Sequence, residues 1–196
     1  MTDQSEDPTM GVQTPSRRQE AAMGEAQITE TDFTVRLVTI RSKKSFAEVT
    51  GEIERLLQPY DLDKLSNLAA AGDAEKFDAY AKQVDGSAGF GMFFQLDMGS
   101  LMRPAAIPIE SKVYLIGSVI TGQGLFRYSG VAGLGAPVRF CVSQRDGEDT
   151  RIDIDRPTSF HSQFPELSPS GVPAWKDAHM LPLLATVAAI SWPPEE

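Results

Sequence analysis

A single cysteine, Cys141, is the scarcest feature of this sequence, and it excludes an intramolecular disulfide bond. Histidine is nearly as rare, with two in 196 residues, and no group of His, Cys, Asp and Glu has the spacing of metal ligands. Basic residues are also in deficit, because 18 Lys and Arg stand against 27 Asp and Glu. An acidic chain without clustered basic residues lacks the groups that bind phosphates, so we expect no nucleic acid partner.

Long apolar runs are missing as well. The N-terminus has no apolar segment typical of a secretory signal peptide. The longest apolar stretch, residues 180–190, is too short to span a bilayer and contains Pro182. The glycines of residues 122–135 do not form the strand–GxGxxG–helix unit that binds dinucleotides. We therefore expect a soluble cytoplasmic protein that has no membrane partner and needs no cofactor.

The chain consists of two segments that differ in composition. Residues 1–32 hold seven acidic and two basic residues, a net charge of −5, and no aromatic residue. Such a segment buries too little apolar surface to offset the entropy lost on ordering, so we predict a disordered acidic tail. Residues 33–196 have the length and the apolar content of a single domain.

The first half of this domain reads as a strand followed by helices. Alternating apolar residues predict a strand over 33–40. Ser45 and Glu48 then form the S-x-x-E capping box that starts a helix, which ends at Gln58-Pro59. Leucines and aromatic residues at helical spacing predict a pair of helices over 61–86.

The second half reads as consecutive strands. Apolar alternation predicts strands over 90–96 and 113–120. Residues 138–144 and 150–155 predict a hairpin, because Asp146-Gly147 between them favours the positive φ angles of a tight turn.

A glycine-rich connector over 121–137 precedes the hairpin, and a final helix is predicted to begin near Pro182. The order of elements is therefore β-α-(αα)-β-β-β-β-α. This order predicts an α+β two-layer sandwich, with a mainly antiparallel sheet and helices on one face.

Residues 112–160 resemble the signature half of DUF302, a family of domains of unknown function. A strand runs into the turn 117–119, a short apolar segment with Arg127 follows, and Ala-Gly-Leu-Gly-Ala-Pro then occupies 132–137. The hairpin leads to Ile-Asp-Arg-Pro-Thr-Ser over 154–159. The resemblance extends more loosely over 33–191. It implies a TATA-binding-protein-like α+β fold, β-α-β-β-β-β-α, in agreement with the order of elements. Relative to that fold, the helical pair over 61–86 would be an insertion between the first helix and the second strand.

The sequence departs from that family at two turns. Gly117-Ser118-Val119 stands where Gly-Asn-Pro is usual, and Asp97-Met98-Gly99 stands where many relatives carry His-Gly. The resemblance implies no settled activity, and a fold by itself does not define a function.

Candidate catalytic residues follow the predicted strands: Asp97 after the second, Arg127 in the glycine-rich connector, and His161 after the hairpin. A carboxylate or an imidazole can move a proton, and a guanidinium can stabilise an oxyanion. Each also has a structural interpretation, as an ion pair for Asp97 and as a solvated loop residue for the other two. If the loops after strands two, three and five meet, four further residues complete a substrate-binding pocket: Phe93, Tyr114, Tyr128 and Asp155.

These residues favour a small-molecule-binding domain whose ligand lies in an apolar cavity between sheet and helices. The predicted chemistry is cofactor-independent acid–base catalysis, as in an isomerase, cyclase or lyase, on an apolar carbonyl metabolite of a biosynthetic pathway. The alternative is a non-catalytic interaction module that forms a homodimer. The polar face of the hairpin would mediate it, through Arg139, Cys141, Ser143, Arg151, Asp153 and Asp155.

Overall fold

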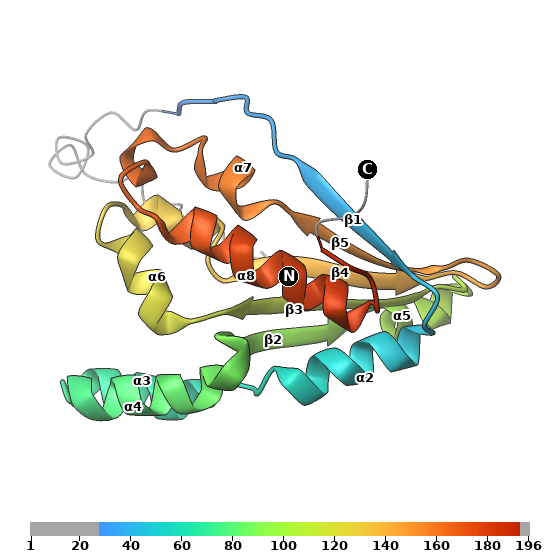
Figure 1. The fold of residues 1–196 in the computed structure, drawn as a ribbon, viewed down its shortest axis with the longest axis horizontal. Helices are drawn as coiled ribbons and strands as arrows, with labels where there is room; N and C mark the ends of the chain where they lie inside the picture. The colour runs from blue at the N-terminus through green and yellow to red at the C-terminus, as the bar shows by residue number, and fades with distance from the viewer. Residues whose placement is uncertain (1–27, 193–196) are drawn as a thin grey trace, which may run out of the picture. The chain divides into compact units, whose positions relative to one another are not determined.

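The structure, a computed structural model, describes residues 28–192 and has a five-stranded antiparallel sheet (Figure 1). The spatial order of the strands is β1-β5-β4-β3-β2, and every neighbouring pair is antiparallel. The strands are β1 (Leu37–Ser42), β2 (Gly91–Asp97), β3 (Glu110–Gly117), β4 (Val138–Gln144) and β5 (Thr150–Asp155). Two long helices, α2 (Phe46–Leu56) and α8 (Val172–Val187), pack against one face of this sheet. The predicted α+β sandwich is therefore confirmed.

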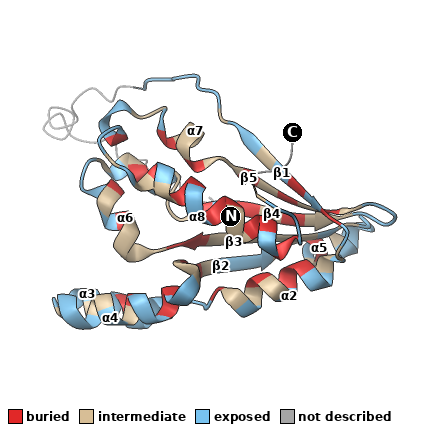
Figure 2. Cartoon of the chain, viewed as in Figure 1, coloured by how far each residue is buried: buried red, intermediate tan, exposed pale blue. Residues whose placement is uncertain are grey.

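The core lies between the sheet and these two helices. Strand β5 alternates strictly between buried and half-buried residues, as expected where one face of a sheet packs against a second layer. Figure 2 shows the buried residues along the sheet and on α2 and α8. The largest fully buried side chains include Phe90, Tyr114, Ile116, Phe140, Ile152 and Ile154 near or in the sheet, Ile53 and Leu57 at α2, and Met180 and Leu181 on α8. Each such side chain stabilises the fold by about 1.5–3 kcal/mol relative to leaving it exposed.

Helix α2 begins as its sequence predicts. The Ser45 hydroxyl accepts a hydrogen bond from the Glu48 amide at 3.3 Å, and the Glu48 carboxylate accepts one from the Ser45 amide at 2.8 Å. The predicted capping box is thus present. Strands β4 and β5 form the predicted hairpin, and Gly147 has a φ of +75° in the turn between them. Asp146 does not have a positive φ, and five residues connect the strands, so the prediction of positive φ at both turn residues is met only at Gly147.

Two helices, α3 (Leu62–Ala70) and α4 (Ala74–Asp85), lie within the range predicted for a helical pair. Each begins after an aspartate whose carboxylate accepts a hydrogen bond from the third residue of the helix. They form a second, smaller core with the loop before them, made of Tyr60, Leu65, Ala81 and Val84.

Several boundaries differ from the prediction. Strand β1 begins at Leu37 and not at Phe33. Helix α8 begins ten residues before Pro182, which lies inside the helix. The proline removes one backbone donor, but the apolar face of α8 packs into the core and outweighs that loss. The strand predicted over 113–120 is wrong at its end, because β3 stops at Gly117 and residues 119–120 belong to a helix. The segments between the main elements contain short helices, α5 (Met98–Met102), α6 (Val119–Phe126) and α7 (Pro157–His161), with 3₁₀ turns at Gly86–Ala88, Arg103–Ala105, Gly130–Leu134 and Pro165–Leu167.

The side chains of β2 change faces part-way along the strand, which the sequence did not predict. Met92 pairs with Ile116 and Phe94 with Leu115, so a bulge inserts one residue between them. As a result Met92 is buried in the core, whereas Phe94 is 49% exposed on the opposite face. The predicted single apolar face over 90–96 is therefore wrong beyond Met92.

The structure describes most of the predicted domain but only a short part of the predicted tail. Among the described residues, 33–192 belong to one compact unit. The predicted disordered tail, 1–32, lies outside the described residues up to residue 27, and residues 28–32 have no helix or strand. None of the described helices is long and apolar enough to cross a membrane.

Candidate functional site

The predicted site residues lie at opposite ends of the sheet. Antiparallel neighbours end at opposite edges, and Asp97 at the end of β2 pairs with Lys112 near the start of β3. Strands β3 and β5 both end at the other edge, where α6 and α7 follow. Seven residues of β2 separate the two edges by about 20 Å, and Figure 1 shows α5 and α6 at these two edges. The prediction that the loops after strands two, three and five meet is wrong for strand two.

Asp97 and Tyr114 have structural roles. The Asp97 carboxylate caps α5, since it accepts hydrogen bonds from the amide and the hydroxyl of Ser100 at 2.8 and 2.6 Å. Tyr114 is fully buried, stacks on Phe140 and donates its hydroxyl to Glu54 at 2.9 Å. Tyr114 is enclosed and cannot contact a substrate, and the Asp97 carboxylate is engaged as a helix cap at the far edge of the sheet, so both assignments are corrected.

Arg127 and Tyr128 follow α6 at the same edge as His161. Both are exposed, and neither lines the two cavities described next. For Arg127 the geometry matches the structural alternative of a solvated side chain.

Asp155 and His161 line a common cavity of about 210 Å³ at the end of β5. His161, on α7, is buried and not a surface residue. Its Nδ1 lies 2.8 Å from the Pro157 carbonyl, which can only accept, so Nδ1 carries the hydrogen and Nε2 keeps its electron pair. Burial lowers the pKa of His161 and favours this neutral form. Nε2 is buried and has no hydrogen-bond partner among the described residues.

A second, apolar cavity of about 370 Å³ lies beside it, and the two cavities share Pro137. Phe93, one of the predicted ligand-binding residues, forms part of its wall. The other lining residues come from the end of β3, from α6, from the segment before β4 and from α8: Gly117, Ser118, Val119, Gly122, Gln123, Phe126, Ala136 and Lys176.

Lys176 is the one ionisable side chain among the residues that line this apolar cavity. It is 3% exposed, and its ammonium donates one long hydrogen bond, 3.4 Å, to the Gly135 carbonyl. Among the described residues it forms no salt bridge, because the neighbouring Asp177 carboxylate is held at 2.7 Å by Arg156. Desolvation without a counter-charge lowers the pKa of Lys176 to about 8.

Gly135 lies against both Lys176 and His161. Its carbonyl accepts the Lys176 hydrogen bond, and a Cβ placed on it would lie 3.0 Å from Cε1 of His161 and 2.5 Å from the Phe160 ring. Only glycine allows the chain to pass this close to both side chains. The site therefore combines an uncompensated amine in the wall of the apolar cavity with an imidazole in the wall of the adjoining cavity, where burial favours the neutral form.

The sequence contains a pattern that indicates Lys176, although its interpretation missed the residue. Lys176, Met180 and Leu184 recur at intervals of four, so they lie on one side of α8, and the other two are fully buried. A lysine in register with core residues is exceptional. Placing the helix start at Pro182 left Lys176 in a loop and hid this spacing.

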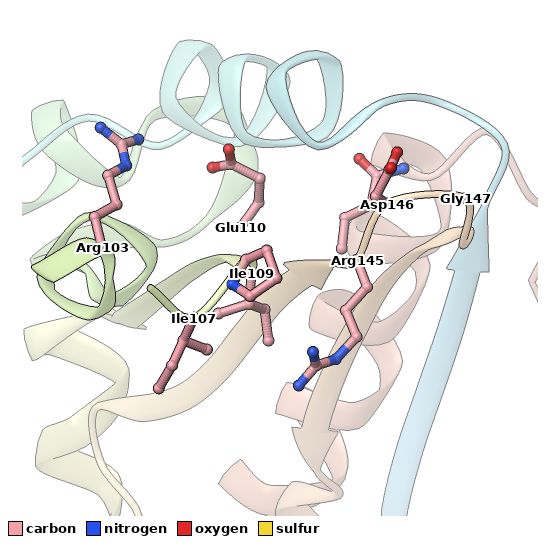
Figure 3. Close-up of a pocket in the computed structure, with 9 residues that line it drawn as sticks. Arg103, Ile107, Ile109, Glu110, Arg145, Asp146 and Gly147 are labelled. Atoms are coloured by element: carbon pink, nitrogen blue, oxygen red, sulfur yellow. The ribbon is translucent and has the colours of Figure 1, made fainter. Parts of the chain in front are cut away.

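A larger hollow of about 400 Å³ lies at the opposite edge, between the loop before β3 and the β4–β5 turn. Figure 3 shows Ile107 and Ile109 between Arg103 and Arg145, whose guanidinium groups do not converge. The charged side chains that line this hollow are exposed, and none of its described residues has a polar atom that is both buried and without a partner, so it is a weaker candidate than the Lys176 cavity. No group of metal-ligating side chains occurs within residues 28–192.

Comparison with known proteins establishes the fold. The chain is similar to the crystal structure of the uncharacterized conserved protein DUF302 from Bacillus stearothermophilus, with a TM-score of 0.52 and 12% sequence identity. The match covers 78% of this chain and 95% of that chain. The chain thus has a DUF302-like fold, as its sequence predicts. No protein-family model matches the sequence, and no curated protein does.

The buried amine makes stability depend on pH in a defined direction. Because the pKa of Lys176 is lower in the folded chain than in the unfolded one, the unfolded chain binds more protons between about pH 8 and 10.5. The free energy of unfolding should therefore rise across this window, by roughly 2 kcal/mol from this group. Lys176→Met should remove the rise, whereas Lys82→Met, on the exposed surface of α4, should keep it. Urea denaturation of the three proteins at pH 7 and pH 10 measures the difference, and parallel pH profiles for all three would contradict it.

Proposed function

We propose that this chain binds a small apolar carbonyl compound in the cavity between α6, α8 and the end of β3. The observation that carries the proposal is the amine of Lys176 at the wall of an otherwise apolar cavity. A volume of about 370 Å³ suits a small organic molecule, since such sites measure about 300–1,000 Å³ and combine apolar walls with few polar groups.

The chemistry that we propose is acid–base catalysis without a cofactor, as in an isomerase, cyclase or lyase. A useful general base has a pKa close to the working pH. Lys176, whose pKa burial lowers to about 8, meets this requirement, and His161 holds a free electron pair on Nε2. These two groups take the proton-transfer roles first assigned to Asp97 and His161.

The cavity is walled by Phe93 and Phe126, with Val119 beside them. Aromatic walls favour a ligand with an apolar body, whose carbonyl group would then lie toward Lys176. We propose a biosynthetic metabolite of this class and a cytoplasmic location, which the free thiol of Cys141 fits.

Filling the cavity tests the proposal. Gly122 lies in α6 at the cavity wall, and a Cβ on it meets no atom within 4 Å, so Gly122→Leu should place a side chain in the cavity without a clash. Gly51→Leu is the matched control, because Gly51 also lies inside a helix with open space around it but far from the cavity in the fold. We expect 4-phenyl-2-butanone and related ketones to raise the melting temperature of the wild type and of Gly51→Leu, but not of Gly122→Leu.

The matched pair separates a ligand in the cavity from a ligand bound elsewhere. Equal shifts in both variants would place binding outside the cavity. The absence of any shift across a panel of apolar aldehydes and ketones would reject the proposed function.

A homodimer is the second candidate, and the uncovered face of the sheet favours it. Leu37, Phe94 and Leu96 are exposed there by 58%, 49% and 36%. Arginines and aspartates share this face, with Arg151 2.9 Å from Asp153 and Arg139 3.8 Å from Asp155. Apolar residues beside charges of both signs suit a self-complementary contact between two copies.

Light scattering tests the dimer. If two copies pair through this face, Phe94→Asp should convert a dimer into a monomer, because two carboxylates would be buried without partners. The control is Leu62→Asp on α3, where the side chain is also exposed, 49%, but lies outside the sheet. A wild-type protein that is monomeric at high concentration excludes this candidate.

A further inference from the structure

We propose that Lys176 is a nucleophile that forms a covalent imine with an aldehyde or ketone held in the apolar cavity, an inference that rests on the function proposed above. Nothing in the fold likeness assigns this role. The proposal narrows the ligand from carbonyl compounds in general to aldehydes and ketones, since esters and carboxylic acids do not form imines with amines.

The geometry of the cavity places the amine where a bound carbonyl must lie. Lys176 is the sole ionisable residue of a wall made otherwise of apolar and small polar side chains and backbone. The hydrophobic part of a ligand would pack against Phe93 and Phe126, and its carbonyl would face the polar side chains of the wall. Besides Lys176 these are Ser118 and Gln123, and only Lys176 offers an amine nucleophile. The long 3.4 Å hydrogen bond to Gly135 is the only one that the amine makes within the described residues. If the amine turned toward a ligand, it would lose only this weak hydrogen bond.

The amine also lacks the partners that would keep it protonated. No carboxylate forms a salt bridge with it within the described residues. Asp177, the next residue on α8, accepts hydrogen bonds from Arg156, at 2.7 Å, and from the amide and hydroxyl of Thr158, at 3.1 and 2.6 Å. His161 on α7 supplies no counter-charge either, because an imidazole carries no negative charge, and burial lowers its pKa and favours the neutral form. Only the neutral amine has an electron pair for attack, and burial of this kind is how lysines are activated for imine formation.

The reaction is balanced without an oxidant or reductant. The electron pair of the neutral Lys176 nitrogen attacks the carbonyl carbon, and the C=O π pair moves to oxygen. A proton passes from nitrogen to that oxygen and gives a carbinolamine. The nitrogen pair then forms the C=N bond as the C–O bond breaks, and the oxygen leaves as water with a second proton, which comes from the nitrogen. One carbonyl compound and one amine thus give one imine and one water molecule.

His161 is suited to carry these protons. Its Nε2 is buried and unpaired, and Gly135 lies against both side chains. An imine withdraws electrons from the carbon next to it. The C–H bond at that carbon, or the bond from that carbon to a carboxyl group, is therefore weakened. The substrates that benefit are β-keto acids, β-hydroxy ketones and enolisable ketones, which agrees with an isomerase or lyase.

Reductive trapping tests the imine directly. We would incubate the full-length protein with 4-phenyl-2-butanone and sodium cyanoborohydride at pH 8 and map the modified peptide by mass spectrometry. The expected product is one adduct per chain on Lys176, with the mass of the probe less one oxygen atom. The neutral fraction of an amine with a pKa of 8 exceeds that of a surface lysine by on the order of 100-fold near pH 7. Labelling of Lys176 should therefore precede that of exposed lysines by 10-fold or more, on the order of that ratio.

Three controls keep the outcome decisive. Lys176→Met and Lys176→Arg should lose the early adduct, whereas Lys82→Met should keep it; circular dichroism verifies that each variant is folded. The peptide map of the wild type locates the adduct even if a Lys176 variant fails to fold. Labelling spread evenly over exposed lysines would overturn the proposal.

The two proposals fail in different ways. A melting-temperature shift that Gly122→Leu abolishes, without an adduct on Lys176, would retain the binding site and reject the imine. The absence of both a shift and an adduct would reject the binding site too.

Discussion

The candidate site depends on one electrostatic constraint, the burial of the Lys176 amine without a counter-charge. Burying an ammonium group is costly unless a carboxylate or several hydrogen bonds compensate it. Here a single long hydrogen bond to Gly135 remains, and the adjacent carboxylate is engaged by Arg156. A sequence selected for stability alone would place an apolar residue at this position, so the lysine favours a functional explanation.

The fold explains how such a residue is held. Helix α8 is anchored at Met180, Leu181 and Leu184, all fully buried against the sheet, so its first turns are fixed in place beyond the end of β3. The segment before β4 passes close to α7 and α8 because Gly135 has no side chain. Helix α6 forms the remaining wall, and the missing side chain of Gly122 leaves part of the space of the cavity. The site therefore lies where two helices and two strand ends meet.

Local patterns predicted much of the fold. The capping box of Ser45 and Glu48, the hairpin turn at Asp146-Gly147 and the alternation of β5 each depend on neighbouring residues, and each is present. The order of elements and the similarity over 112–160 then led to the α+β sandwich. Non-local features were missed. The bulge in β2 is set by pairing with β3, and Pro182 inside α8 is tolerated because of tertiary packing.

The candidate site was only partly predictable for the same reason. His161, Asp155 and Phe93 were identified as site residues, and the structure places each at the wall of one of two adjoining cavities. Asp97 was placed wrongly, because its position requires knowing that β2 and β3 are antiparallel neighbours that end at opposite edges. Lys176 was missed because its burial becomes visible only when the start of α8 is known.

The titration of Lys176 itself is the most direct measurement of the central claim. The chemical shift of its Cε in protein labelled with ¹³C-lysine, assigned by its loss in Lys176→Met, follows the protonation of the amine. The account predicts a midpoint near pH 8, well below that of the exposed lysines. A midpoint near that of the exposed lysines would show that the amine is solvated or paired, and would contradict the account.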